Sequence, residues 1–289
     1  MLFAYITTSQ APFRTKIISY FIRINKGMKK MSPKAFLRLE HIHFSYYGAI
    51  GEVEVINDLN FSIEKGSFTA FVGPSGCGKS TILSLIAGLL QPTKGTLTFY
   101  SEDFTAPGIG YMLQHDHLLE WRDVYHNILL GLEIQHKLTK ENLTLVNELL
   151  EKYHLSEAKN QRPSALSGGM RQRIALIRTL ALRPDLLLLD EPFSALDYQT
   201  RLHVSMDVHN IIKSEKKTAI LVTHDITEAI AMADTVIILS KSPCQVKKII
   251  PIEFEKHEIP RIAVRNSPLF QEYFDCIWRD LQDEKDNNN

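Results

Sequence analysis

The sequence lacks long apolar runs, has few cysteines and carries no excess of charge of either sign. A membrane-spanning helix needs about 18 or more consecutive apolar residues, and no such stretch occurs among the 289 residues. Three cysteines, Cys77, Cys244 and Cys276, are too few for a disulfide framework and fit a reducing compartment. The 33 basic and 33 acidic residues balance, so net charge does not point to a nucleic-acid partner, and we expect none. These absences disfavour an integral membrane protein and a disulfide-stapled scaffold.

The composition is that of an ordinary globular protein. Apolar residues make up 44% of the chain and charged residues 23%, which is enough to bury a core. The length predicts one large domain or two closely associated subdomains. Internal repeats and low-complexity linkers are not visible.

Residues 1–34 form an N-terminal extension before the first clear strand. Its apolar part is broken by Arg14, Lys16 and Arg23 and lacks the charge-then-apolar order of a signal peptide. Met28 and Met31 stand just before the strand, so translation could start at Met1 or at either of them. The extension is therefore interpreted as untranslated or disordered, with an interfacial amphipathic helix as the alternative.

The sequence GPSGCGKST at residues 73–81 has the spacing of a phosphate-binding loop. It follows an apolar strand-like stretch, 68–72, and precedes a helix-like stretch, 82–90. Glycines allow consecutive N–H groups to turn toward phosphate oxygens, and the helix start adds its positive end. Lys79 is predicted to reach the β- and γ-phosphates, and Ser80 to bind Mg²⁺. Cys77 is interpreted as a packing residue, with a redox switch as the alternative. The candidate nucleotide-binding residues here are Gly73, Ser75, Gly76, Cys77, Gly78, Lys79, Ser80 and Thr81.

Polar residues with the chemistry of ATP hydrolysis follow three further apolar stretches. Leu186–Leu189 ends in Asp190 and Glu191, which a parallel strand would deliver to the ligand-binding edge of a sheet. Asp190 is predicted to hold Mg²⁺ through water, and Glu191 to act as the general base. His224, after the stretch 218–223, is a candidate for bonding the γ-phosphate, or else a satisfied core or turn histidine. Gln114, after the stretch 109–113, is a candidate for binding Mg²⁺ or the attacking water.

The periodicity changes along the chain. Alternating apolar residues predict strands from Leu37, with a one-residue phase shift before Ile42 that a bulge would explain. Helical periodicity dominates from about 115, and we predict an inserted helical subdomain at about 115–183. Strand–helix alternation resumes from Pro184. The pattern predicts one domain over 35–246, followed by a helical tail, 247–289, with a helix starting at Ser267–Pro268.

The sequence LSGGMRQR, residues 166–173, resembles the signature motif of ATP-binding-cassette (ABC) ATPases. The phosphate-binding loop, Gln114, this motif, Asp190–Glu191, the stretch 194–197 and His224 occur in the order of that family. The resemblance covers roughly residues 37–240. It implies an α/β fold with a P-loop nucleotide-binding core and a mixed sheet, an antiparallel β subdomain and an inserted α-helical subdomain.

The resemblance also implies how such a chain works. Ser167, Gly168 and Gly169 would close over ATP held by the opposite subunit of a homodimer, with Asp197 at the interface. Two ATP molecules, each with Mg²⁺, would thus be sandwiched between two copies. Tyr46 matches the aromatic residue that stacks on adenine; Tyr47 and an ordinary strand-end tyrosine are the alternatives.

Local sequence resembles the nitrate, sulfonate and taurine importer group. Leu118–Arg122 reads LLEWR where the group usually has Leu-Leu-Pro-Trp, so Glu120 replaces the proline, and Asn127 follows as it does in the group. The resemblance implies an ATPase at the cytoplasmic face of a membrane, bound peripherally to two permease subunits and linked only indirectly to a solute-binding protein. Alternatives are an importer of a thiamine pyrimidine precursor and a cassette without a membrane partner. Trp121 is interpreted as a permease contact or as core of the helical insert.

Overall fold

The computed structural model describes residues 35–48, 51–100, 107–254, 265 and 267–286, with only the backbone for 283–286. Within the chain, contacts define two compact units. The first unit comprises residues 1–107 and 221–289, and the second unit comprises residues 108–220. The expectations for residues 1–34, including the choice of start residue, lie outside the described residues.

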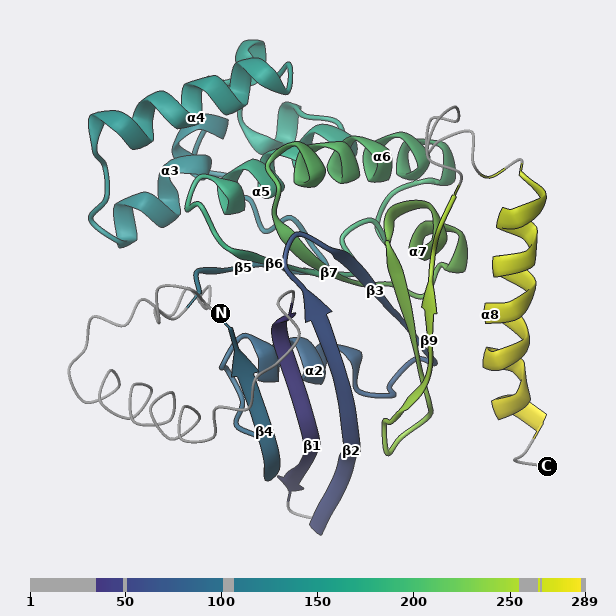
Figure 1. Ribbon diagram of the computed structural model, residues 1–289. Helices are drawn as coiled ribbons and strands as arrows, with labels where there is room; N and C mark the ends of the chain where they lie inside the picture. Colours follow the sequence, from purple (N-terminus) through teal and green to yellow (C-terminus); the bar gives the residue numbers. More distant parts are fainter. Residues whose placement is uncertain (1–34, 49–50, 101–106, 255–264, 266, 287–289) are drawn as a thin grey trace. The chain divides into compact units, whose positions relative to one another are not determined.

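An antiparallel sheet in the first unit has the strand order β2-β1-β4 (Figure 1). Its strands are β1 (Ala35–Gly48), β2 (Gly51–Glu64) and β4 (Lys94–Phe99). Leu37, Leu39, Ile42 and Phe44 are buried, because alternate residues of a strand face the same side of a sheet. The predicted antiparallel β subdomain is therefore present in the fold.

The phase shift in β1 is a bulge at His41. The register of β1 with β2 shifts between Leu39 and Ile42, and His41 has a φ of 51°. Gly95 lies opposite this bulge with a φ of 91°, and a Cβ there would be 2.1 Å from the carbonyl oxygen of His41. Only glycine allows the two backbones to approach so closely.

A second, mixed sheet of the first unit contains β3 (Phe68–Val72), β8 (Thr235–Leu239) and β9 (Val246–Pro251). β3 pairs with β8 in parallel, and β8 pairs with β9 in antiparallel fashion. β9 was not predicted, and the expected start of a helical tail at 247 falls inside it. Among its residues only Ile250 is buried, so β9 has no apolar alternation that would mark it in the sequence.

The described helices of the first unit are α2 (Lys79–Ile86), α7 (Ile226–Met232) and α8 (Pro268–Asp286). α2 ends four residues earlier than the helix-like stretch predicted. α8 begins as predicted, because the hydroxyl of Ser267 accepts a hydrogen bond from the N–H of Phe270. Phe270 and Ile277 of α8 are buried, whereas Trp278 is 47% exposed.

The second unit combines strands and helices. β5 (Ile109–Met112) and β6 (Leu186–Asp190) pair in parallel, and β7 (Thr218–Val222) follows β6 in strand order and runs on into the first unit. Residues 115–183 form only helices and turns, which confirms the predicted helical character. The helices in this stretch are α3 (Val124–Ile134), α4 (Lys140–Lys152), the short 3-10 helices η1 (Ser156–Ala158) and η2 (Pro163–Ala165), and α5 (Gly168–Leu180). The second unit also contains α6 (Tyr198–Ser214).

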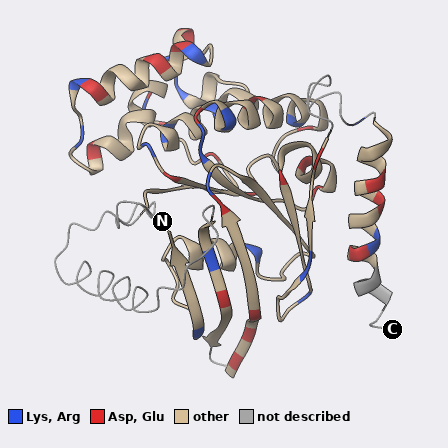
Figure 2. Cartoon of the chain, in the orientation of Figure 1, with Lys and Arg blue, Asp and Glu red and all other residues tan. Residues whose placement is uncertain are grey.

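In both units the charged residues lie largely outside the buried strands. β3 carries no charged residue and is buried throughout, and β6 carries only Asp190 at its end. α4 carries charges of both signs (Figure 2), while Val146, Leu149 and Leu150 form its buried face. None of the helices in the described part of the chain combines the length and apolar character needed to cross a membrane.

Candidate functional site

The phosphate-binding loop of the first unit leads directly from β3 into α2. The N-cap residue of α2, Gly78, provides no side-chain hydrogen bond. A helix start without a side-chain cap is suited to an anion, because its N–H groups and its dipole both favour negative charge. In contrast, α3 to α7 each have an N-cap side chain that accepts a hydrogen bond from the first turn. These caps are Asp123, Thr139, Ser167, Asp197 and Asp225.

Lys79 is held across the loop. Its side chain is buried, and Nζ donates hydrogen bonds of 2.8 Å to the carbonyl oxygens of Gly73 and Pro74. An ammonium group has three donors, so these two bonds orient the positive charge within the loop. A buried cation at an uncapped helix start is the arrangement expected for phosphate recognition.

Two loop positions require their residue types. Gly78 has a φ of 113°, and a Cβ there would lie 2.9 Å from Cγ1 of Val55, so a side chain would be strained and crowded. Cys77 is buried, and its Sγ would lie 3.2 Å from a Cβ placed on Gly73. This packing supports the interpretation of Cys77 as a small space-filling residue.

Of the two neighbouring tyrosines Tyr46 and Tyr47, Tyr46 contacts the end of the phosphate-binding loop. Its hydroxyl forms a 3.3 Å hydrogen bond with Oγ1 of Thr81, and its ring is 46% exposed. The hydroxyl of Tyr47 donates instead to Glu52. Hydrogen bonding and the charge of Glu52 raise the pKa of Tyr47. The contacts therefore favour Tyr46 over Tyr47 as the residue beside the nucleotide.

His224 lies in a turn between β7 and α7. The N–H of Thr223, its neighbour, donates to the carbonyl oxygen of Phe71 in β3, so the turn lies at the strand end that opens into the phosphate-binding loop. Asp225 donates its N–H to Oγ1 of Thr223 and caps α7. His224 is exposed, so the alternative of a core histidine is wrong, and the alternative of a turn histidine stays open.

In the second unit the acids and Gln114 follow neighbouring strands. Met112 of β5 is paired with Leu189 of β6, so Gln114 and Glu191 both follow the carboxyl end of the β5–β6 pair. The hydroxyl of Tyr111 donates a 3.3 Å hydrogen bond to Oδ2 of Asp190. Sequence reasoning missed Tyr111, because nothing in a strand marks which tyrosine faces an acid.

Glu191 adopts a conformation that is uncommon for a residue with a side chain. Its φ is 44°, in the left-handed region. Its carbonyl oxygen accepts hydrogen bonds from the N–H of Ser194, at 3.2 Å, and from the Ser194 hydroxyl, at 3.0 Å. Strained backbone is concentrated at functional sites, and Ser194 is the residue that stabilises it here.

The candidate signature loop begins α5. The hydroxyl of Ser167 accepts a hydrogen bond from the N–H of Met170, and both Ser167 and Gly168 are exposed. Gly169 is buried, and a Cβ there would approach Cγ2 of Val204 to 2.8 Å. Asp197 is exposed and caps α6. The hydrogen bond from Thr200 holds the pKa of Asp197 below its usual range.

The segment before α3 presents Trp121 to solvent. The Trp121 side chain is 74% exposed, and the alternative that it belongs to the core of the helical insert is wrong. Asn127 of α3, which is fully buried, organises this segment. Its side chain accepts from the N–H of Leu119 and donates to the carbonyl oxygens of Leu119, Arg122 and Asp123.

The candidate residues thus fall into two groups, one in each unit. The first unit holds Tyr46, the loop 73–81 and His224. The second unit holds Gln114, the loop 167–169, Asp190, Glu191 and Asp197. The roles that sequence reasoning missed are those of Tyr111, Asn127 and Ser194, each of which forms a hydrogen bond to a site residue or to the backbone of a site segment.

Comparison with known proteins identifies the family. The family model for the ABC transporter matches residues 56–194. The ABC transporter ATP-binding protein YtlC of Bacillus subtilis, a protein of uncharacterised function, is 44% identical over 249 residues, which are 86% of this chain and 96% of YtlC. The chain belongs to the ABC transporter ATPases.

The other similarities place this cassette in the sulfonate and nitrate importer group. An aliphatic sulfonates import ATP-binding protein of Bacillus licheniformis is 39% identical, covering 76% of the cassette and 84% of that protein. The nitrate import ATP-binding protein NrtD of Synechococcus elongatus is 34% identical, covering 88% and 98%. Among solved structures, the dimeric ATP-binding cassette MJ0796 bound to ADP and Pi has a TM-score of 0.62 at 27% identity, covering 76% of the cassette and 100% of that chain. The cassette is thus an ATP-binding ATPase of a family that drives transport.

Proposed function

We propose that this cassette energises the import of a small solute such as a sulfonate, taurine or nitrate. It works as a homodimer on two permease subunits at the cytoplasmic face of a membrane, with the solute-binding protein contacting only the permeases. The relatives named for sulfonate and nitrate import support this proposal, as does the exposed Trp121 in the segment that would meet a permease.

Nucleotide binding is assigned to the first unit. The ring of Tyr46 stacks on adenine, and the buried ammonium of Lys79 with the start of α2 holds the phosphates. Magnesium fits the proposed donor set, because Ser80, Gln114 and Asp190 offer the oxygen atoms that this ion prefers. When bound, Mg²⁺ would neutralise charge on the β- and γ-phosphates.

Hydrolysis is assigned to residues at strand ends. The carboxylate of Glu191 accepts the proton of the attacking water as general base, and its position depends on the strained backbone that Ser194 holds. His224 donates a hydrogen bond to the γ-phosphate, and Gln114 orients the water. After hydrolysis the γ-phosphate contacts are lost, which releases the closed state.

The signature loop acts on the nucleotide of the second copy. Ser167, Gly168 and Gly169 present an exposed helix start to that γ-phosphate, and Asp197 lies at the interface between copies. ATP then stabilises the dimer by linkage, since it binds the closed form more tightly than the open form.

The Glu191→Gln variant tests the sandwich. It retains the nucleotide contacts but lacks the base, so it should accumulate as an ATP-bound dimer with saturating Mg-ATP. Light scattering with size exclusion measures the mass. Adding Lys79→Ala to this variant serves as the control, because it removes phosphate binding and should return the protein to a monomer. A single variant that stays monomeric with Mg-ATP would contradict the sandwich.

Gene deletion in the native host tests the solute. Growth of the deletion strain is measured with a sulfonate or taurine as sole sulfur source and with nitrate as sole nitrogen source. The strain should fail to grow on the solute that the transporter imports. The wild-type gene should restore this growth, and the gene for the Glu191→Gln variant should not. Unimpaired growth on all of these, with lost rescue by a thiamine pyrimidine precursor, would favour the alternative importer.

Membrane association tests the alternative of a cassette without a membrane partner. The native protein should sediment with membranes and be released from them with its permease subunits by detergent. Trp121→Ala should shift it to the supernatant if Trp121 contacts the permease. A wild-type chain found only in the supernatant would support the alternative.

A further inference from the structure

Two arginines of α5 bind the same segment, residues 114–123, which we call the coupling loop. Arg171 and Arg178 are about two helical turns apart and so lie on one face of α5. Both side chains reach the coupling loop, but they bind different groups in it. All of these residues belong to the second unit.

Arg178 holds the backbone of the coupling loop. Its side chain is buried, and it donates from Nη1 to the carbonyl oxygen of His117, at 2.9 Å, and from Nη2 to that of Asp116, at 2.6 Å. Asn127 binds the backbone at the other end of the loop through Leu119, Arg122 and Asp123. Arg178 and Asn127 therefore bind the backbone of the coupling loop, one toward each end.

Arg171 binds the acidic side chains of the coupling loop instead. Its Nε and Nη2 donate to the two carboxylate oxygens of Asp116, at 2.8 and 3.2 Å, the paired geometry that gives arginine–carboxylate bonds their strength. Its Nη1 lies 3.1 Å from Oε1 of Glu120. Burial raises the pKa of Asp116, but hydrogen bonds from Arg171 and from the N–H of Leu118 outweigh it and hold that pKa below its ordinary value.

These ion pairs join two parts of the proposed mechanism. The N–H of Arg171 donates to the carbonyl oxygen of Ser167, so Arg171 lies one helical turn after the start of the signature loop. On the other side, Asp116 is two residues after Gln114, and Glu120 directly precedes the exposed Trp121. Arg171 is thus the side chain that ties the coupling loop to the first turn of α5.

We propose that Arg171 is a positioning residue for ATP hydrolysis: through Asp116 and Glu120 it makes the coupling loop and the signature loop move as one body. The proposal rests on the proposed function, in which Ser167 acts on the nucleotide of the second copy. A small misplacement of a group that contacts the transferred phosphate lowers turnover steeply. Because the phosphate-binding loop lies in the other unit, the binding of nucleotide to a single copy does not depend on Arg171.

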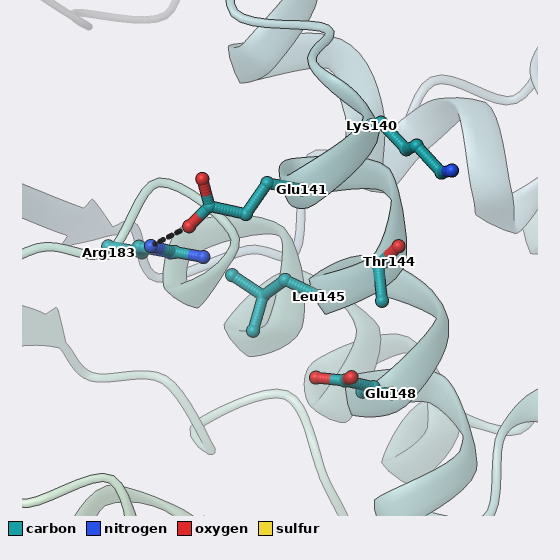
Figure 3. Close-up of a pocket in the computed structure, with 6 residues that line it drawn as sticks. All are labelled: Lys140, Glu141, Thr144, Leu145, Glu148 and Arg183. Carbon is teal, nitrogen blue, oxygen red and sulfur yellow. Dashed lines mark ion pairs between the residues drawn. The ribbon is translucent and has the colours of Figure 1, made fainter.

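The experiment compares Arg171→Ala and Asp116→Asn with a matched control. The control is Arg183→Ala, because Arg183 follows the opposite end of α5 from the signature loop and pairs with Glu141 of α4 at 2.8 Å in the same unit (Figure 3). Steady-state kinetics of the full chain give kcat and KM for Mg-ATP. Hydrogen exchange without nucleotide reports the amides of residues 116–120 and 167–171 separately.

Both test variants should lower kcat by about 10- to 100-fold, with KM and the affinity of a single copy for nucleotide within about twofold of wild type. Hydrogen exchange should rise in both segments together. Glu120→Gln removes only the more exposed pair, so kcat should fall about two- to fivefold. Arg183→Ala should keep kcat within about twofold of wild type.

Wild-type kcat in Asp116→Asn, which keeps the shape of the side chain, would overturn the proposal even if Arg171→Ala fails to fold. Equal losses of kcat in Arg171→Ala and Arg183→Ala would overturn it too, because they would indicate general destabilisation. Failure of the importer proposal would appear separately, as unimpaired growth of the deletion strain, while the wild-type chain still hydrolyses ATP.

Discussion

Two glycine-rich loops of this cassette each lead into a helix, yet they present different chemistry. The loop before α2 has no side-chain cap and contains the buried ammonium of Lys79. The loop before α5 is capped by the hydroxyl of Ser167, and the arginine in its first turn, Arg171, is engaged by Asp116. In the proposed function, the first loop therefore binds the phosphates of its own chain's nucleotide, whereas the second helix start acts on the nucleotide of the other copy.

The largest expected effect comes from removing the cation of the first loop. Lys79→Ala should weaken binding of ATP to a single copy by about 100-fold, since each charge-assisted hydrogen bond contributes about 1.5–3 kcal/mol, and turnover should be lost with it. Titration with a fluorescent ATP analogue measures the affinity. Unchanged affinity would remove the distinction between the two loops.

Ser167→Arg tests the second loop, because this variant should keep ATP binding and lose hydrolysis, whereas Lys79→Ala should lose binding. A bulky cation at the exposed start of α5 should leave binding of ATP to a single copy within about twofold of wild type, while hydrolysis falls below detection. The same titration and a phosphate-release assay measure both properties. Weakened binding in the single copy would mean that this loop acts on the nucleotide of its own chain.

A pair of glycines in the first loop separates crowding from backbone strain. Both have positive φ, but a Cβ on Gly78 would meet Val55 at 2.9 Å, whereas a Cβ on Gly76 would meet no atom within 4 Å. Gly76→Ala should cost about 1–2 kcal/mol of unfolding free energy, and Gly78→Ala more than that. Urea unfolding measures both; equal losses would show that crowding at Val55 contributes nothing.

The smallest effect concerns the cap of α5. Ser167→Ala should cost about 1 kcal/mol of unfolding free energy, because the N–H of Met170 loses its acceptor. Thr139→Ala at the start of α4 is the matched control, since the Thr139 hydroxyl caps Asn142 in the same way. The two variants should unfold at similar urea concentrations, but only Ser167→Ala should lower turnover. Equal turnover in the two would contradict a role for the Ser167 hydroxyl beyond capping.

The parts of the fold that could be predicted are those that depend on the pattern of neighbouring residues. The bulge at His41 followed from a shift in alternation, and β6 followed from four leucines before Asp190. β9 could not be predicted, because an edge strand with a single buried residue has no periodicity. The exposure of Trp121 was open for a related reason: an aromatic residue in a loop fits the core and the surface equally well until the loop is placed.

The order of its motifs alone determined that this chain is an ABC ATPase, because phosphate chemistry demands particular residues at short, fixed spacings. Only the tertiary structure decided which side chains support those motifs. The pairing of Arg171 with Asp116 and the hydrogen bond from Arg178 to the carbonyl oxygen of His117 join segments that are brought together by folding. Hydrogen bonds and ion pairs depend on distance in space, and a linear sequence specifies that distance only within a turn, a strand or a helix.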